Sequence, residues 1–166
     1  EPLVLTGARV LVAGAGTTGV SAVAALTEWG AQPILTDRRF ADDATPPAGL
    51  PAGTALAAPG DYLRSAADFA EIDLIVTSPG FPPTDAMLSA AAAAGVPVWG
   101  DVELAWRADR AGLCGAPRRW LVITGTNGKT TTTAMTEAVL QAAGVPSLAC
   151  GNIGLKIGRA SCRERV

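Results

Sequence analysis

The residues best suited to chemistry lie in one run rich in glycine and threonine, 125–133. It reads Gly-Thr-Asn-Gly-Lys-Thr-Thr-Thr-Thr and follows the apolar stretch 120–123. An apolar strand, a glycine loop and a Lys-Thr pair that opens a helix place backbone N–H groups and an ammonium around a polyphosphate. Lys129 is one of only two lysines among 13 basic residues, and its slim ammonium suits such a loop better than a planar guanidinium. The run predicts a phosphate-binding loop, with the Thr130 hydroxyl facing Mg²⁺.

The match to the general nucleotide loop is incomplete. The pattern G-x-x-x-x-G-K-[ST] would place its first glycine where Ile123 stands, so the run is a shorter variant. The alternative to a phosphate-binding loop is a turn rich in glycine and threonine that only caps the following helix. That helix is expected to carry an apolar stripe through Met135 and Val139 and to end at Gly144.

A second glycine loop lies near the start of the chain. An apolar strand over 9–13 runs into G-x-G-x-x-G at 14–19, a helix follows, and a strand over 33–36 ends on Asp37. An acid about 20 residues after the loop is typical of Rossmann-type units, where it binds a ribose. The pattern predicts a nucleotide site, and a structural βαβ turn without a ligand is the alternative.

The elements that must position these loops alternate along the chain. After an irregular crossing over 40–60, we expect a strand over 72–77, a helix over 85–94, a strand over 96–99 and a short helix from Gly100. Repeated β-α alternation predicts an α/β fold with a parallel sheet covered by helices.

Composition suggests the domain boundaries. Residues 1–107 are expected to form a Rossmann-like nucleotide-binding domain, and 108–118 a linker. Residues 119–155 hold one strand, one helix and a strand near 146–150, which is too little to bury a sheet. They predict the incomplete first part of a second, P-loop-type domain. The basic, aperiodic residues 156–166 are expected to be a non-native tail on a truncated gene, and a natural basic tail is the alternative.

Composition also excludes several kinds of function. The absence of histidine excludes Ser-His and Cys-His nucleophiles and His-ligated metals from this chain. The three cysteines form no C-x-x-C pair and give no zinc or redox signal. A net charge of −2 without a basic cluster argues against a nucleic-acid partner. The lack of a long apolar run and of a leader pattern predicts a cytoplasmic protein that does not enter the membrane.

Several motifs resemble, in their order, those of the Mur ligases, the ATP-dependent ligases of bacterial wall synthesis. They are Gly14-x-Gly16-x-Thr18-Gly19-x-Ser21, Asp37-Arg38-Arg39, Ser78-Pro79-Gly80, Gly100-Asp101-Val102-Glu103-Leu104, the phosphate loop at 125–130 and Gly151-Asn152-Ile153-Gly154. The phosphate loop alone fits every Mur ligase and the folylpolyglutamate synthetases. The other motifs narrow the resemblance to the D-glutamate-adding branch, over about residues 3–155.

The resemblance implies a three-domain ligase, in which 1–107 is the domain that binds the UDP-linked substrate and 119–155 is the first part of the ATP-binding central domain. It also implies that ATP phosphorylates the alanyl carboxylate of UDP-N-acetylmuramoyl-L-alanine and that D-glutamate then forms an amide. On this resemblance, the ATP site consists of Gly125, Thr126, Asn127, Gly128, Lys129, Thr130 and Thr131. Lys129 and Thr130 are implied to be catalytic, with Thr130 on Mg²⁺. The substrate site is implied to consist of Thr17, Thr18, Asp37, Arg38, Arg39, Ser78, Gly80 and Asn152. The full-length parent is expected to be a monomer, and this chain alone to be inactive because the other metal ligands and the third domain lie beyond it.

Two other functions stay open at this point. An NAD(P)-dependent oxidoreductase would use the first glycine loop and Asp37, and Arg38 with Arg39 would suit a 2′-phosphate. A second phosphate loop is unexpected in that class. The other alternative is a non-catalytic UDP-sugar-binding module.

Overall fold

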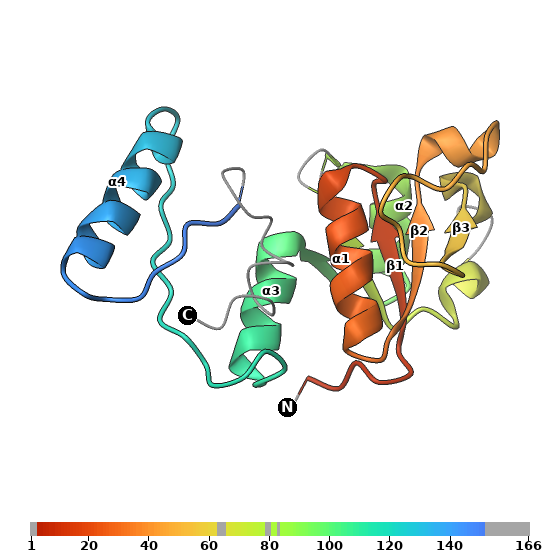
Figure 1. The fold of residues 1–166 in the computed structure, drawn as a ribbon. Coiled ribbons are helices and arrows are strands. Elements are labelled where there is room, and N and C mark those ends of the chain that lie inside the picture. The colour runs from red at the N-terminus through yellow and green to blue at the C-terminus, as the bar shows by residue number, and fades with distance from the viewer. Residues whose placement is uncertain (1–2, 63–65, 79–80, 83, 152–166) are drawn as a thin grey trace.

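The fold was analysed in a computed structural model, which describes residues 3–62, 66–78, 81–82 and 84–151 (Figure 1). The strands are β1 (Arg9–Ala13), β2 (Gln32–Thr36), β3 (Ala55–Ala57), β4 (Leu74–Thr77) and β5 (Val98–Gly100). The α-helices are α1 (Thr17–Glu28), α2 (Ala86–Ala93), α3 (Asp101–Arg110) and α4 (Lys129–Ala142), and the short 3₁₀ helices are η1 (Arg38–Ala41), η2 (Pro59–Tyr62) and η3 (Ala66–Phe69). None of the helices in the described ranges is long and apolar enough to span a membrane.

The strands form one parallel sheet in the order β3-β2-β1-β4-β5. At the carboxyl end of β1, Ala13 lies opposite Thr36 of β2 on one side and Thr77 of β4 on the other. The chain moves outward from β1 through β2 to β3 and then returns to the far side of β1 with β4 and β5. The order therefore reverses between β1 and β4, and the carboxyl ends of these strands form the switch point at which such sheets bind ligands.

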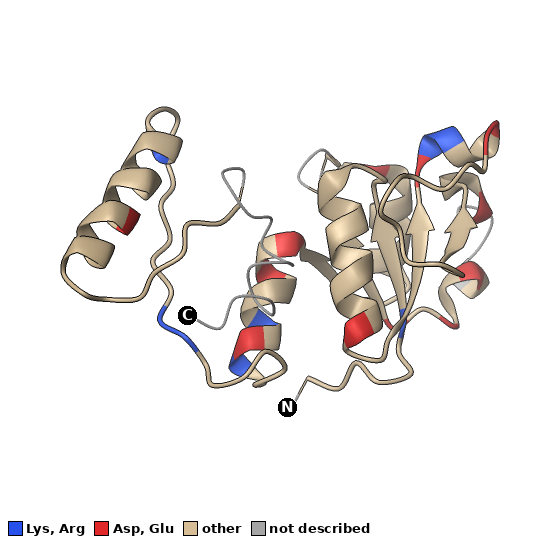
Figure 2. Ribbon diagram, in the orientation of Figure 1, with Lys and Arg blue, Asp and Glu red and all other residues tan. Residues whose placement is uncertain are grey.

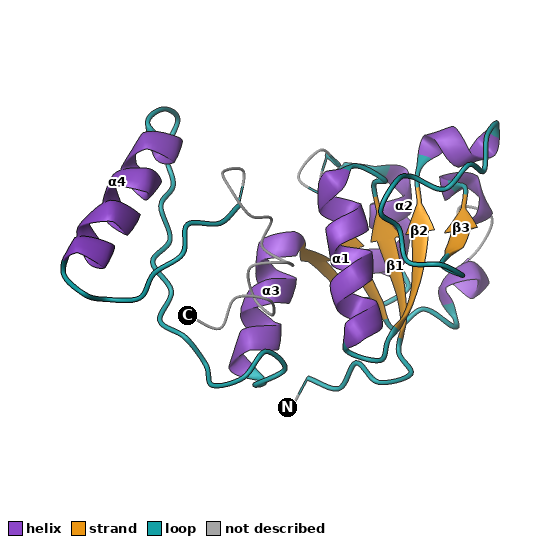
Figure 3. Cartoon of the chain, viewed as in Figure 1, coloured by secondary structure: helices purple, strands orange, loops and turns teal. Residues whose placement is uncertain are grey.

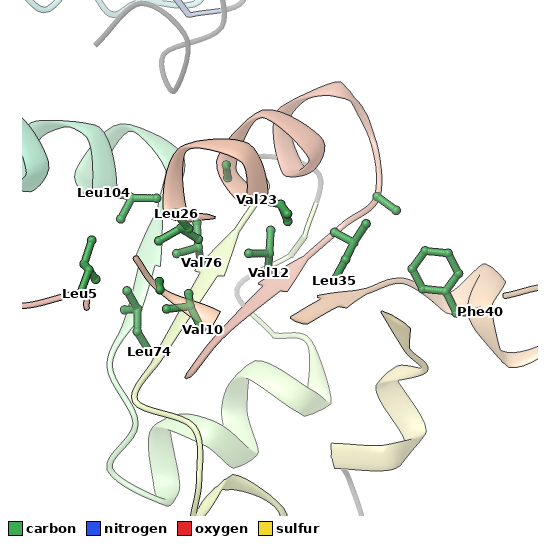
Figure 4. Close-up of a cluster of buried hydrophobic side chains, with 13 residues drawn as sticks. Leu5, Val10, Val12, Val23, Leu26, Leu35, Phe40, Leu74, Val76 and Leu104 are labelled. Atoms are coloured by element: carbon green, nitrogen blue, oxygen red, sulfur yellow. The ribbon is translucent and has the colours of Figure 1, made fainter. Parts of the chain in front are cut away.

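The sheet is buried on both faces. One core lies against α1 and α3, and its members include Val10, Val12, Val23, Leu26 and Leu104 (Figure 4). The opposite core lies against α2 and η3, and its members include Leu11, Ala13, Phe69, Ile75 and Met87. Alternate residues of β1 enter opposite cores, which explains why the strand is apolar throughout. The expected parallel, helix-covered sheet is confirmed.

Two details of this domain differ from the sequence-based expectation. The segment 40–60 is not wholly irregular, because it contains β3, whose Ala55 pairs with Ile34 of β2. An edge strand of three residues, two alanines and one leucine, is too short to show an alternation of apolar and polar residues. Its conformation therefore comes from pairing with β2 and not from the strand propensity of its residues. The helix expected to be short from Gly100 continues to Arg110, since Leu104, Ala105 and Ala108 are buried against the domain.

The segment beyond the linker is organised differently. The strands expected over 120–123 and near 146–150 are absent, since 120–125 and 145–149 have no regular secondary structure (Figure 3). A strand needs a hydrogen-bonded neighbour, and the described part of the chain pairs none with 120–123. Helix α4 buries no residue and stands away from the sheet (Figure 1).

The apolar side chains of this segment are accordingly open to solvent. Leu121 is 69% exposed, Val122 75%, Met135 63% and Val139 66%. This exposure agrees with the expectation that residues 119–155 are too few to bury a sheet. Helix α4 also carries few charges along its length (Figure 2).

Candidate functional site

The first glycine loop joins the carboxyl end of β1 to α1 at the switch point. Gly14 has φ +104°, and a Cβ there would lie 2.9 Å from Ser78 Oγ. A Cβ on Gly19 would lie 1.8 Å from the Gly14 carbonyl oxygen, whereas one on Gly16 would meet nothing within 4 Å. The positive φ and the nearby Ser78 side chain therefore explain the first glycine of the motif, and close backbone approach explains the third.

Asp37 and Arg39 hold this loop in place. Asp37 Oδ2 accepts a hydrogen bond from Ala15 N at 2.8 Å, and Oδ1 accepts one from Arg39 N at 3.2 Å. The Arg39 guanidinium donates in turn to the Ala15 carbonyl. Each carboxylate oxygen keeps a further lone pair, so Asp37 can still accept a hydrogen bond from a ligand. Such a contact stays a prediction. The contacts in the structure are those of a clamp on the loop backbone.

Arg38 points to a different neighbour. Its side chain is 81% exposed and lies 3.5 Å from Asp85, between Arg38 Nη2 and Asp85 Oδ2. Asp85 also caps α2 by accepting from Met87 N at 3.0 Å. An ion pair this exposed contributes about 1 kcal/mol or less, so Arg38 is held weakly. Sequence reasoning did not include Asp85 in the site, although an Asp before an alanine-rich helix is a recognisable N-cap.

Thr17 and Thr18 open helix α1 at the same edge. The N-cap, Gly16, supplies no side-chain hydrogen bond to the first turn. Thr17 is exposed and Thr18 half-buried. The first N–H groups of a helix lack intrahelical partners, and together with the helix dipole they attract anions.

Two buried hydroxyls lie beside the loop. Ser78 follows β4 and donates its N–H to the Ala13 carbonyl at 3.0 Å. Its Oγ, and Oγ1 of Thr36 at the end of β2, are buried and have no hydrogen-bond partner among the described residues. Buried hydroxyls usually have one, so this edge offers polar atoms that a ligand or water would satisfy. Gly80, also expected here, lies outside the described residues.

The second glycine loop leads into α4 beyond the linker. Gly125 has φ +147°, and Gly128, the N-cap, has φ +75° and offers no side-chain cap. Lys129 Nζ donates to the carbonyl oxygens of Gly125 and of Thr126, the latter at 3.3 Å. The ammonium is thus folded over the loop, and no described side chain caps the first turn of α4, which is the arrangement a phosphate site requires. This arrangement fits the predicted phosphate loop.

The other predicted members of this site are placed as follows. Asn127, Thr130 and Thr131 are exposed at the loop and the first turn of α4. Asn152 lies outside the described residues. In the described ranges, no group of three or more His, Cys, Asp or Glu residues is placed to hold a metal ion. The role of Thr130 as a Mg²⁺ ligand stays a prediction.

A cavity of about 440 Å³ lies at the opposite, amino end of the strands. Arg9, Gln32 and Ala55 line it. The charged group of Arg9 is already paired with Glu71. We place the candidate site at the carboxyl edge instead, because the glycine loop, its clamp and the two unpartnered hydroxyls lie there.

Sequence reasoning missed a buried carboxylate at the end of α3. Asp109 is 1% exposed. Its Oδ2 accepts hydrogen bonds from Arg110 Nη2 at 2.8 Å, Arg118 N at 3.0 Å and Trp120 Nε1 at 3.0 Å. Arg118 Nη1 lies 4.0 Å from Oδ1. We call Asp109, Arg110, Arg118 and Trp120 the linker clasp. A lone Asp in a helix gives no sequence signal for such a cluster.

The clasp should make stability depend on pH. Burial raises the pKa of Asp109, but the hydrogen bonds from Arg110, Arg118 N–H and Trp120 outweigh it and lower this pKa below its ordinary 3.8. The stabilisation is therefore complete above pH 3.8, the ordinary value, and is lost as pH falls through the lower folded-state pKa. We expect the difference in unfolding free energy between wild type and Asp109→Asn to shrink as pH falls from 3.8 through the lower pKa that Asp109 has in the folded state.

Urea unfolding at a series of pH values measures this difference. Glu103→Gln is the matched control, because Glu103 lies on the same helix in an exposed pair with Arg107. Its effect should be small throughout. A wild-type-to-Asp109→Asn difference that stays constant across the acid range would contradict the assignment.

The fold and these two loops define a doubly wound α/β protein with a dinucleotide-type glycine loop and a separate phosphate loop. The family model of the Mur ligase MurD-like N-terminal domain matches residues 8–100, and that of the Mur ligase middle domain matches 123–164. The chain belongs to the Mur ligase family, as the sequence motifs predicted.

Individual relatives agree with this family. The UDP-N-acetylmuramoylalanine–D-glutamate ligase of Mycolicibacterium smegmatis is 57% identical over 149 residues, which cover 89% of this chain and 29% of that protein. The ligase of the same name from Rhodococcus jostii is 53% identical over 92% of this chain and 30% of its own length. That from Nocardia farcinica is 49% identical over 92% and 31%. The chain thus spans about 30% of the length of these relatives.

Proposed function

We propose that this chain is the UDP-substrate-binding domain and the start of the ATP-binding domain of a UDP-N-acetylmuramoyl-L-alanine:D-glutamate ligase of peptidoglycan synthesis. The 57% identity to a relative of that name supports the assignment. The structural observation that carries it is the glycine loop at the switch point, clamped by Asp37 and flanked by the unpartnered Ser78 hydroxyl. The activity belongs to a longer protein, and this chain alone is proposed to be inactive.

In the proposed reaction, an oxygen of the alanyl carboxylate attacks the γ-phosphorus of ATP, which gives an acyl phosphate and ADP. The D-glutamate amine then attacks the acyl carbon, loses a proton, forms the amide and releases phosphate. Lys129 would neutralise charge on the transferring phosphoryl group. Mg²⁺, when bound, would supply further charge neutralisation, and Thr130 would hold it together with phosphate oxygens and water.

The substrate nucleotide would bind at the carboxyl edge of the sheet. The first turn of α1, with Thr17 and Thr18, would face the diphosphate. Asp37 and Arg39, which hold the loop, would also border the uridine. Ser78 would give its hydroxyl to the ligand. Arg38, Gly80 and Asn152 would complete the site.

Further proposals concern the whole protein. It would work in the cytoplasm as a monomer and would bind no nucleic acid or membrane. The family match disfavours the oxidoreductase alternative, because a Mur ligase uses its first domain for a UDP-linked substrate. Protection of the chain from thermal unfolding by a UDP-sugar, but not by NADH, would separate the two.

Calorimetry of the 166-residue chain with UDP tests the substrate site. We expect binding by the wild type, and Asp37→Ala should weaken it by about 1–3 kcal/mol, because the variant loses a charge-assisted anchor of the loop. Asp42→Ala is the control, since this exposed acid follows η1 without bonding the loop. Absence of UDP binding by the folded wild type, or equal affinities of the Asp37→Ala and wild-type chains, would overturn the assignment.

A further inference from the structure

We propose that Asp109 is a positioning residue that fixes the direction in which the chain leaves the N-terminal domain, and so the place of the phosphate loop relative to the glycine loop. The proposal rests on the geometry of the linker clasp and not on the proposed ligase activity.

Asp109 is attached firmly to the N-terminal domain. Three preceding residues of α3 are buried, namely Leu104, Ala105 and Ala108. Leu104 belongs to the core that lies between the sheet and helices α1 and α3. The same helix is held from β5, because the Arg107 guanidinium lies 4.5 Å from the ring centre of Trp99. The Asp109 carboxylate therefore has little freedom to follow the linker if the linker moves.

The groups that Asp109 binds belong to the departing chain. Arg118 N–H and the Trp120 indole N–H both reach Oδ2 across nine and eleven residues of sequence. The Arg110 guanidinium bonds Oδ2 and also donates to the Arg118 carbonyl, so both backbone polar groups of Arg118 are held. Trp120 lies only just before residue 123, where the match to the Mur ligase middle domain begins.

The clasp fixes the connection between α3 and α4 near its middle. No helix or strand lies between Arg110 and Lys129, all of which the structure describes (Figure 3). With Arg118 and Trp120 fixed, the free length shrinks to the few residues before the phosphate loop. Without the clasp, the residues from Arg118 to the phosphate loop lose these anchors, and the reach of a flexible segment grows with its length.

A charged oxygen is needed because three N–H groups converge on it in a nearly dry place. An ionised carboxylate accepts all three, and hydrogen bonds to a charged acceptor are the stronger kind. The amide of Asn keeps one acceptor oxygen but turns an N–H₂ group toward the two guanidinium groups. Asp109→Asn should therefore release the linker and leave the core residues of α3 in place.

Distance measurement between spin labels tests the proposal on the 166-residue chain. One label replaces exposed Ser89 on α2 and the other exposed Ala138 on α4, both through an encoded ketone amino acid so that the cysteines are untouched. We expect a single narrow distance distribution in the wild type. Asp109→Asn should broaden it and add new distances, whereas Glu103→Gln, on the same helix, should not.

A second variant guards against misfolding. Trp120→Phe removes one donor from outside the N-terminal core, and it should broaden the distribution to a smaller extent. Trypsin cleavage after Arg118 should become about tenfold faster in Asp109→Asn, as local opening becomes more frequent. Hydrogen exchange in β1 and β4 should be the same in Asp109→Asn as in the wild type. If Asp109 only stabilised the N-terminal domain, exchange in these strands would become faster. A folded Asp109→Asn or Trp120→Phe chain with the wild-type distribution, or a broad distribution in the wild type, would refute the proposal.

Discussion

Replacing Lys129 by Ala in a complete ligase that contains this chain should lower the ligation rate by about 10²-fold or more without unfolding the protein. Lys129 is exposed, and within the described ranges its ammonium bonds only the carbonyls of its own loop, so the folded state should not depend on it. Phosphoryl transfer depends on positioned positive charge, so loss of this donor acts on the transition state. The measurement is ADP release dependent on D-glutamate.

The control for this prediction lies on the same helix. Thr136 bonds the Thr132 carbonyl within α4, away from the loop, so Thr136→Ala should leave the rate nearly unchanged. Lys129→Arg should also be slow, because a planar fork does not fit where a point donor lies. A ligation rate that is unaffected by Lys129→Ala would show that the loop does not hold the transferring phosphate.

Gly19→Ala should destabilise the N-terminal domain by about 3 kcal/mol or more, because the new Cβ would need space that the Gly14 carbonyl occupies. The Cβ would lie 1.8 Å from that oxygen, a distance that a rotamer change cannot relieve since both groups belong to the backbone frame. Either the loop or the start of α1 must move. We expect weaker UDP binding as well, because the same loop is proposed to hold the ligand.

Gly16→Ala is the matched control in the same motif. Gly16 has φ −77° and open space around its Cβ position, so alanine should cost under about 1 kcal/mol there. Urea unfolding followed by circular dichroism measures both variants. Equal stabilities of the two alanine variants would mean that the approach of Gly14 and Gly19 is not as close as the structure has it.

Much of the N-terminal domain was predictable from local patterns. The apolar runs that became β1, β2 and β4, and the glycine loop after β1, each carry their signal within a few neighbouring residues. β3 escaped prediction because three residues at a sheet edge acquire their conformation from pairing with β2. The candidate site was likewise predictable only in part. Its residue types were visible in the motifs, but the hydrogen bond between Asp37 and Ala15 and the ion pair between Arg38 and Asp85 join segments that are apart in the sequence, so local patterns do not predict them.

The sequence by itself therefore determined the family, the parallel sheet and the two glycine loops, because strand periodicity, glycine spacing and helix starts are local properties of the chain. Only the tertiary structure decided that 120–123 is not a strand and that Asp109 binds the linker. Both depend on whether a partner lies alongside: an unpaired strand lacks hydrogen bonds, and a carboxylate is buried only where donors from distant residues converge on it.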